Sequence, residues 1–353
     1  MRITASAPGK IVLLGEYAVL AGVPALVMAI DRRAEVQLTE NRRQYSRLTA
    51  PGYTDQVLRF TFDGDTPQWC GPQEGDHRYD LAVRVIDDIL ASAGRRPENF
   101  DLVLRTDALH LDLGRSGLAK LGLGSSAALT VALASALAHH LGWEYALDLD
   151  SWMDRLGRIH RSFQGGHGSG LDVAAGIHGG VIEYRLSSGS SAPRVTQLEP
   201  LRLPGVFVWT GSSASTPELV RRFDAWRASA PRPSARVIDD LQAISKAGIE
   251  AFRDREIAAF VEAMGEYANT LRILGERAGI EIFSRDHLRL QELARAYGAV
   301  YKPCGAGGGD IGIALNTNVS ALQGFIEHIE PLGYAKLQVN VAENGLKTIR
   351  RQT

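Results

Sequence analysis

A segment rich in glycine and serine has residue types that suit the binding of a polyphosphate: Lys120-Leu121-Gly122-Leu123-Gly124-Ser125-Ser126-Ala127-Ala128. Gly122 and Gly124 have no Cβ, so their backbone N–H groups can approach a ligand closely. The Ala- and Leu-rich stretch 125–141 predicts a helix, whose N-terminus adds free N–H donors and a positive partial charge. Ser125 and Ser126 can bind a phosphate oxygen or a metal ion, or can simply cap the helix, and this segment alone supports both interpretations equally.

A lysine near the N-terminus is a second candidate for chemistry. Lys10 follows Pro8-Gly9 and precedes the short apolar run 11–14, which predicts a buried strand. A lysine that points from the edge of such a strand into a cleft can neutralise a phosphoryl group during its transfer. Taken alone, Lys10 is better interpreted as an exposed surface charge.

A second glycine-rich segment, 302–310, has four glycines in the five positions from Gly305 to Gly309. Such a run is costly in backbone entropy, and a plain hairpin needs only about two turn residues. We therefore expect close approach of this backbone to a ligand. Cys304 precedes the run, and because no histidine lies near it in sequence, we interpret it as a buried or incidental thiol rather than a nucleophile.

A carboxylate, Asp172, follows the glycine-rich loop 164–170 at the start of a predicted short helix, 171–176. Asp172 could accept a proton, orient an acceptor or face a metal ion, whereas a lone aspartate at a helix start is most often a cap. His167 in the same loop could contact an anionic substrate, although a loop histidine is more often only solvated.

The composition is that of a globular protein. The chain has 353 residues, of which 45% are hydrophobic and 22% charged, and this length suggests two domains. A balance of 39 basic and 40 acidic residues argues against nucleic-acid binding. Two cysteines support neither a disulfide framework nor a zinc site. The chain shows no apolar signal region and no apolar run long enough to span a membrane, so we expect a soluble, cytoplasmic protein.

The elements that must position these residues alternate between strands and helices, which predicts two α+β domains. The polar, Gly- and Pro-containing stretch 187–193 predicts a boundary, with domains at 1–190 and 191–353. Expected strands are 11–14, 23–30, 34–39, 100–104, 180–184, 206–209 and 335–341, with two more beside the second glycine run; expected helices are 77–93, 125–141, 147–163, 171–176, 235–278, 285–297 and 319–329.

Together, these segments resemble the galactokinase, homoserine kinase, mevalonate kinase and phosphomevalonate kinase (GHMP kinase) superfamily. Its three motifs occur in order, at 6–17, 122–128 and 302–310, and the resemblance covers nearly the whole chain. It implies an α+β fold with a left-handed βαβ crossover in an N-terminal ATP-binding domain and a ferredoxin-like C-terminal domain. It also implies a small-molecule kinase that uses ATP and Mg²⁺ and acts as a monomer or homodimer.

The resemblance assigns a role to individual residues. Lys10 and Asp172 would be catalytic, with Lys10 between donor and acceptor and Asp172 orienting the acceptor, and Ser126 would contact Mg²⁺. The ATP phosphates would be bound by Lys120, Gly122, Leu123, Gly124, Ser125, Ser126 and Ala127. The acceptor would be bound by Glu16, Tyr17, His167, Ser169, Gly170, Ser213, Thr216, Gly305, Ala306, Gly307 and Gly308.

Within the superfamily, the segments 15–20, 168–175, 209–216 and 305–314 resemble the phosphomevalonate kinase branch, which phosphorylates (R)-5-phosphomevalonate in isoprenoid biosynthesis. Mevalonate kinases usually carry a metal-binding Glu shortly before the catalytic Asp, but no acidic residue lies between Asp154 and Asp172. Ile311 stands where the branch often has Cys, a small departure. Two alternatives stay open: a mevalonate or sugar kinase, and a non-catalytic relative that binds a ligand and regulates a partner.

Overall fold

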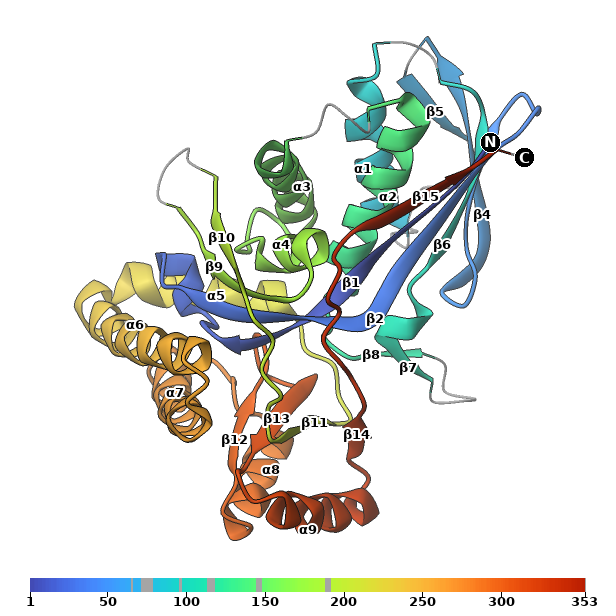
Figure 1. Ribbon diagram of the computed structural model, residues 1–353. Coiled ribbons are helices and arrows are strands. Elements are labelled where there is room, and N and C mark those ends of the chain that lie inside the picture. Colours follow the sequence, from blue (N-terminus) through green and yellow to red (C-terminus); the bar gives the residue numbers. More distant parts are fainter. Residues whose placement is uncertain are drawn as a thin grey trace.

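The computed structural model describes residues 1–64, 66–70, 79–94, 97–112, 118–143, 148–187 and 192–352 (Figure 1). In its larger sheet the strand order is β10-β9-β2-β6-β3-β4-β5, and β1 pairs with both β2 and β15. These strands are β1 (Arg2–Leu14), β2 (Ala25–Glu40), β3 (Ser46–Ala50), β4 (Thr54–Asp63), β5 (Thr66–Cys70), β6 (Phe100–Arg105), β9 (Val181–Arg185), β10 (Arg194–Leu198) and β15 (Lys347–Arg351).

Four helices lie on the same side of this sheet (Figure 1). They are α1 (Asp80–Ala91), α2 (Ser125–Leu141), α3 (Leu149–Phe163) and α4 (Leu171–His178). Helix α2 has the bounds expected from the sequence and is buried on nearly all sides. Its small alanine side chains allow it to pack against β1 and β2 and against the other three helices at once. The N-terminus of α2 is thereby fixed beside β1.

The smaller sheet is antiparallel, with the order β12-β13-β11-β14. Its strands are β11 (Gly205–Trp209), β12 (Val300–Pro303), β13 (Ile311–Leu315) and β14 (Ala335–Leu337), and α8 (Arg285–Ala296) and α9 (Val319–Ile329) pack on it. Helix α8 precedes β12 and α9 joins β13 to β14, which is the βαββαβ order of a ferredoxin-like unit. The expected fold class is confirmed.

Several predicted elements differ from those observed. The helical region expected at 235–278 is two helices, α6 (Pro231–Arg253) and α7 (Ile257–Ala278), because Arg255 adopts a positive φ of 62° between them. Helix α5 (Thr216–Ser229) was not expected. The strands expected at 23–30 and 34–39 are one strand, β2, because the chain stays extended through Asp31–Arg33. The strand expected at 335–341 ends at Leu337.

The expected boundary at 187–193 falls partly on residues 188–191, which lie outside the described part of the chain. On either side of it, β9 and β10 pair with each other in the larger sheet. At the other end of the chain, β15 pairs with β1, so C-terminal residues contribute to the same sheet as N-terminal ones. The division into 1–190 and 191–353 stays a prediction.

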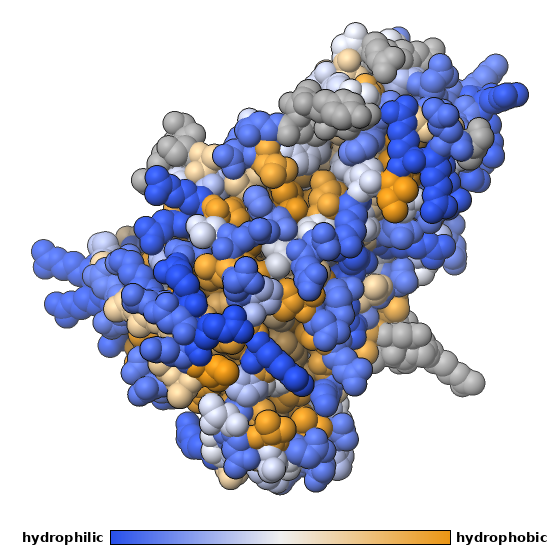
Figure 2. Space-filling model, viewed as in Figure 1, coloured by the Kyte–Doolittle hydropathy of each residue, from blue (hydrophilic) through white to orange (hydrophobic). Residues whose placement is uncertain are grey.

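The surface shown in Figure 2 carries hydrophobic residues in separate patches among hydrophilic ones. Within the described residues, each helix is too short or too polar to cross a membrane.

Candidate active site

The strand β1 places Lys10 beside the glycine–serine loop. The backbone N–H of Lys10 donates to the carbonyl oxygen of Leu123 at 2.8 Å. One residue earlier, a Cβ at Gly9 would lie 2.6 Å from the same oxygen, so only glycine allows the strand to come this close. The register of β1 against β2 also shifts between Pro8 and Gly9, which marks a local irregularity of the strand just before Lys10.

The loop leads into helix α2 without a side-chain cap. Gly124 is the N-cap at a φ of 77°, and the first intrahelical bond runs from the N–H of Ala128 to the carbonyl of Gly124. The N–H groups of residues 125–127 precede that bond and are the free donors of a helix start. Ser125 and Ser126 are helical rather than capping residues, so capping is not the role of either serine.

Lys10 and Asp172 meet at Gly124. A Cβ at Gly124 would lie 3.2 Å from Lys10 Cγ and 3.8 Å from Asp172 Cβ. The ammonium group of Lys10 donates to the carbonyl oxygen of Gly122 at 3.4 Å, and it lies 3.9 Å from the position of a Cβ at Gly305. The lysine therefore lies between the two glycine-rich segments rather than on the surface.

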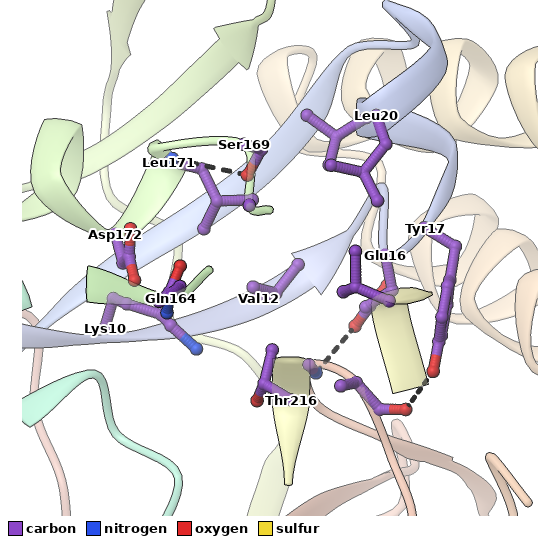
Figure 3. A pocket seen from close by; sticks show the side chains of 15 residues that line it. Lys10, Val12, Glu16, Tyr17, Leu20, Gln164, Ser169, Leu171, Asp172 and Thr216 are labelled. Carbon is purple, nitrogen blue, oxygen red and sulfur yellow. Dashed lines mark hydrogen bonds between the residues drawn. The ribbon is translucent and has the colours of Figure 1, made fainter. Parts of the chain in front are cut away.

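A pocket opens in front of Lys10 and Asp172, and we call it the lysine pocket. Figure 3 shows the side chains of both residues beside Gln164, with Tyr17 and Glu16 at the other end. Its floor is apolar, and its lining residues are Lys10, Val12, Glu16, Tyr17, Val19, Leu20, Gln164, Gly168, Ser169, Leu171, Asp172, Thr216, Val220, Gly305 and Ala306. Of the expected acceptor-binding residues, Glu16, Tyr17, Ser169, Thr216, Gly305 and Ala306 are thus brought together.

A buried ion pair joins the first motif to the third. Lys302 is fully buried and donates to Glu16 Oε1, which also accepts from the N–H of Gly305 at 3.3 Å. The hydroxyl of Tyr17 donates to the carbonyl oxygen of Ala306. Glu16 Oε2 is buried and has no hydrogen-bond partner within the described residues. Because a buried carboxylate oxygen rarely stays unsatisfied, Glu16 is suited to accept a hydrogen bond from a ligand in the lysine pocket.

A second pocket, which we call the serine pocket, lies on the other side of the glycine–serine loop. It combines the hydroxyls of Ser125 and Ser126 with Lys120 and with apolar and aromatic side chains. This lining suits a flat ring joined to anionic groups. None of the remaining lining residues was expected at the site, because they belong to no recognisable motif; they are Ala50, Tyr53, Tyr79, Leu81, Ala82, Leu104, Thr106, His110, Leu129 and Phe163.

Some expected site residues do not line either pocket. Gly307 packs against Ile282, because a Cβ there would lie 2.2 Å from the Ile282 carbonyl oxygen, and the N–H of Gly308 donates to the same oxygen at 2.9 Å. Ser213 donates to the carbonyl of Lys120 at 2.9 Å. His167 lies 3.2 Å from Asp224. Gly170 is the N-cap of α4, and Leu123 and Ala127 have buried side chains.

Asp310 is a site residue that sequence reasoning missed. It ends the second glycine run at a positive φ of 60°. Its carboxyl group packs against Gly122, where an added Cβ would lie only 2.5 Å from it. Burial raises its pKa to about 6, while the N–H of Ala214 and the charges of Lys10 and Lys120 act in the opposite direction. The positive φ of Asp310 was not visible in the sequence.

Cys304 is buried, and burial raises the pKa of its thiol to about 12. A thiol of this kind stays protonated at neutral pH and is a poor nucleophile. The interpretation of Cys304 as a buried thiol is confirmed.

The residues near the loop fit Mg²⁺ only in company with phosphates. No group of three or more His, Cys, Asp or Glu side chains that could hold a metal ion occurs in the described residues. Ser126 and Asp172 offer one hydroxyl and one carboxylate. Mg²⁺ is usually held by one or two carboxylates together with substrate phosphates, so this donor set fits a Mg²⁺ ion that arrives with a nucleotide.

The chain is similar in sequence and in fold to known proteins. Residues 80–180 match the GHMP kinases N terminal domain. A phosphomevalonate kinase of Streptomyces sp. (strain CL190) is 28% identical over 351 residues, which covers 89% of each chain. A mevalonate kinase of Thermococcus gammatolerans is 30% identical over 317 residues, again covering 89% of each chain.

Among solved structures, the Lin0012 protein from Listeria innocua is similar with a TM-score of 0.85 at 23% identity, covering 99% of this chain and 100% of that one. The fold, the three adjoining motifs and these matches show that the chain belongs to the GHMP kinase family.

Proposed function

We propose that this chain transfers the γ-phosphoryl group of ATP to (R)-5-phosphomevalonate, giving ADP and 5-diphosphomevalonate in isoprenoid biosynthesis. The observation that carries the phosphotransfer is the meeting of Lys10 and Asp172 at Gly124, beside the free N–H groups of α2. The choice of acceptor is supported by the similarity to the Streptomyces phosphomevalonate kinase and by the absence of an acidic residue between Asp154 and Asp172.

The nucleotide would bind across the loop. The adenine ring fits the aromatic and apolar part of the serine pocket, and the phosphates would receive hydrogen bonds from the N–H groups of residues 125–127. Bound Mg²⁺ would neutralise part of the phosphate charge, with Ser126 and Asp172 as the protein groups nearest to it. The γ-phosphate would then face the lysine pocket.

The acceptor would lie in the lysine pocket with its own phosphate toward Lys10. An oxygen of that phosphate attacks the γ-phosphorus, and the bond from the γ-phosphorus to the oxygen bridging it to ADP breaks. The Lys10 ammonium offsets the repulsion between the two anions, and positioning supplies most of the rest. A phosphate monoester has its second pKa near ~6, so at pH 7 the attacking oxygen needs no base and Asp172 mainly orients the acceptor.

Mevalonate itself is a second candidate acceptor. Lys10 is the one Lys or Arg in the described lining of the lysine pocket, and Glu16 Oε2 offers an acceptor for a hydroxyl group. Both features suit an acceptor with less negative charge, and the Thermococcus relative is a mevalonate kinase. With an alcohol as nucleophile, the hydroxyl proton must be removed, and Asp172 would be its acceptor.

A substrate panel tests the proposal. ADP release is measured in a coupled assay with phosphomevalonate, mevalonate or galactose as acceptor, each with and without Mg²⁺. We expect the highest kcat/KM for phosphomevalonate and no turnover without the metal. A higher kcat/KM for mevalonate reverses the acceptor assignment. ATP binding without turnover of any acceptor favours the non-catalytic alternative.

The variant Asp172→Asn separates the two acceptors chemically. It keeps the shape of the side chain and removes its capacity as a base. We expect substantial residual kcat with phosphomevalonate. With an alcohol acceptor, loss of a general base should lower kcat by about 10²–10⁴-fold. A loss of kcat with phosphomevalonate as large as that expected with an alcohol acceptor would contradict the orienting role of Asp172.

A further inference from the structure

A histidine that has had no role so far lies between the two sides of the site. His160 is in α3, and its side chain is 1% exposed. Its Nε2 atom is 2.9 Å from Ser126 Oγ at the start of α2. Its Nδ1 atom is 3.8 Å from Asp172 Oδ2 in the first turn of α4. One buried ring thus faces both the serine assigned to the nucleotide side and the carboxylate assigned to the acceptor side.

The neighbours of the ring favour one proton position. At 3.8 Å the two groups are too far apart for a hydrogen bond, but the negative charge of an ionised Asp172 attracts a proton on the nearer ring nitrogen and so favours the tautomer of His160 that carries its proton on Nδ1. Nε2 then has a lone pair and accepts a hydrogen bond from the hydroxyl of Ser126. With its proton turned toward His160, the oxygen of Ser126 presents its lone pairs to a cation.

The position of His160 on α3 indicates that its ring does more than find a hydrogen-bond partner inside the protein. Helix α3 packs against both α2 and α4 but contributes none of the three superfamily motifs. A buried histidine needs only some hydrogen-bond partner; in His140 the neighbours of the ring are the backbone carbonyl of Glu98, 3.1 Å from Nε2, and the carboxylate of Glu40, 3.4 Å from Nδ1, neither of which is a candidate site residue. In His160 both ring nitrogens face side chains of the site instead.

We propose that His160 is a positioning residue for phosphotransfer. It fixes the hydroxyl of Ser126 and the carboxylate of Asp172 relative to each other, and thereby couples the metal-bound nucleotide to the orientation of the acceptor. The inference rests on the proposed function, because it uses Ser126 and Asp172 in the roles given there.

Two amide substitutions of His160 separate its contact with Ser126 from its contact with Asp172. In His160→Gln, the side-chain amide can reach the position of Nε2 and keep the bond to Ser126. In His160→Asn, the amide reaches only the position of Nδ1 and keeps the side toward Asp172. His160→Phe keeps the ring shape and loses both contacts. His140→Gln is the matched control, since it changes another buried helical histidine, at the opposite end of α2 from Ser126.

We expect His160→Asn to weaken the binding of a non-hydrolysable ATP analogue in the presence of Mg²⁺ by about 10-fold, within the range for residues that support a metal ligand. Binding without Mg²⁺ should stay unchanged, and His160→Gln should retain most of the Mg²⁺-dependent affinity. His160→Gln should instead lower kcat, and His160→Phe should show both defects. His140→Gln should show neither, whatever its effect on thermal stability.

The ligand-free protein provides a readout independent of activity. Nitrogen-15 NMR of the imidazole should show the proton of His160 on Nδ1 in the wild type, with the preference weakened in Asp172→Asn. A proton on Nε2 in the wild type overturns the proposal, as does wild-type binding and turnover in His160→Phe. If the wild type turns over no acceptor, the proposed function fails, and the NMR and Mg²⁺-dependent binding measurements still decide the role of His160.

Discussion

The two glycine-rich segments look alike in sequence but serve different needs. Gly124 in the phosphate-side loop and Gly307 in the second run have nearly the same backbone, with φ of 77° and 75°. The nearest atoms to a Cβ at Gly124 would belong to the side chains of Lys10 and Asp172, at 3.2 to 3.8 Å. A Cβ at Gly307 would meet the backbone of Ile282 at 2.2 Å. Gly124 thus leaves room within the site, whereas Gly307 allows the protein to pack against itself.

Because of this difference, a high glycine content alone does not identify a ligand-binding segment. The run from Gly305 to Gly309 was expected to approach a ligand, and only Gly305 and Ala306 line the lysine pocket. Gly309 packs on Ser212, whose carbonyl oxygen would lie 2.9 Å from an added Cβ. A glycine-rich sequence therefore indicates close backbone approach, but it does not say whether the neighbour is a ligand or the protein.

Lys10 lies where the two segments meet, and its charge should have the largest effect. Lys10→Met retains the part of the stem that contacts Gly124 and removes the ammonium group. We expect kcat to fall by about 10²–10³-fold with little change in KM, by analogy with loss of a preorganised oxyanion donor. Lys246→Met, on an exposed position of α6, is the control. A wild-type kcat in Lys10→Met would show that this lysine takes no part in transfer.

Gly124→Ala and Gly307→Ala test the comparison directly. Both variants carry a similar strain, of about 1–2 kcal/mol, for a side chain at positive φ. Gly307→Ala adds a clash with backbone that cannot move aside, so we expect it to lower the Tm clearly more than Gly124→Ala does. Gly124→Ala crowds Lys10 and should lower kcat more than Gly307→Ala does. Thermal denaturation and steady-state kinetics check both, and the reverse order of Tm would refute the distinction.

Asp310 ends the second run against Gly122 of the first, and its effect should be the smallest. Its pKa of about 6 in the folded protein lies above the value of about 3.9 expected in the unfolded chain. The unfolded state therefore loses this proton first, and the contribution of Asp310 to stability falls as pH rises from about 4 to 6. Asp310→Asn should match the wild-type Tm near pH 4 and exceed it by about 1–3 °C at pH 8.

The control for Asp310→Asn is Asp240→Asn, at an exposed position of α6. Its difference from the wild-type Tm should not vary with pH in the same way. A constant difference between Asp310→Asn and the wild type from pH 4 to 8 would mean that Asp310 does not titrate as described.

Sequence reasoning succeeded where the signal was local. The Ala- and Leu-rich stretch after Gly124 gave helix α2 with both ends correct, because glycine flanks it on either side. It failed where a helix break depends on one residue: nothing in the composition around Arg255 indicated its positive φ, so α6 and α7 were expected as one helix. The strands β3 and β5, of five residues each, offer little alternation of apolar and polar residues, and β4 alternates only in its second half, from Leu58 to Phe62; all three were missed.

The site shows the same limit more sharply. The first two motifs located Lys10 and Ser126 as candidates, and the glycine-rich loop 164–170 located Asp172; the structure brings the three residues together. The contacts that hold these residues in place join segments far apart in the sequence, so the spacing of residues along the chain does not predict them. Lys302 and Glu16 are 286 positions apart, and His160 lies outside all three motifs. Such residues become visible only when α3 and β12 are placed in space.

The pairing of β1 with β15 has a consequence for how the protein is made. The strand that carries Lys10 is synthesised long before its partner: Arg2 to Ser6 at its start pair with residues 347–351, the last of the described strands to leave the ribosome. Figure 1 shows both termini side by side at one end of this pair. Throughout translation that edge of β1 lacks its native neighbour, and an unpaired edge can pair wrongly with another chain. Among the described strands of this sheet, β15 is thus translated after every candidate site residue.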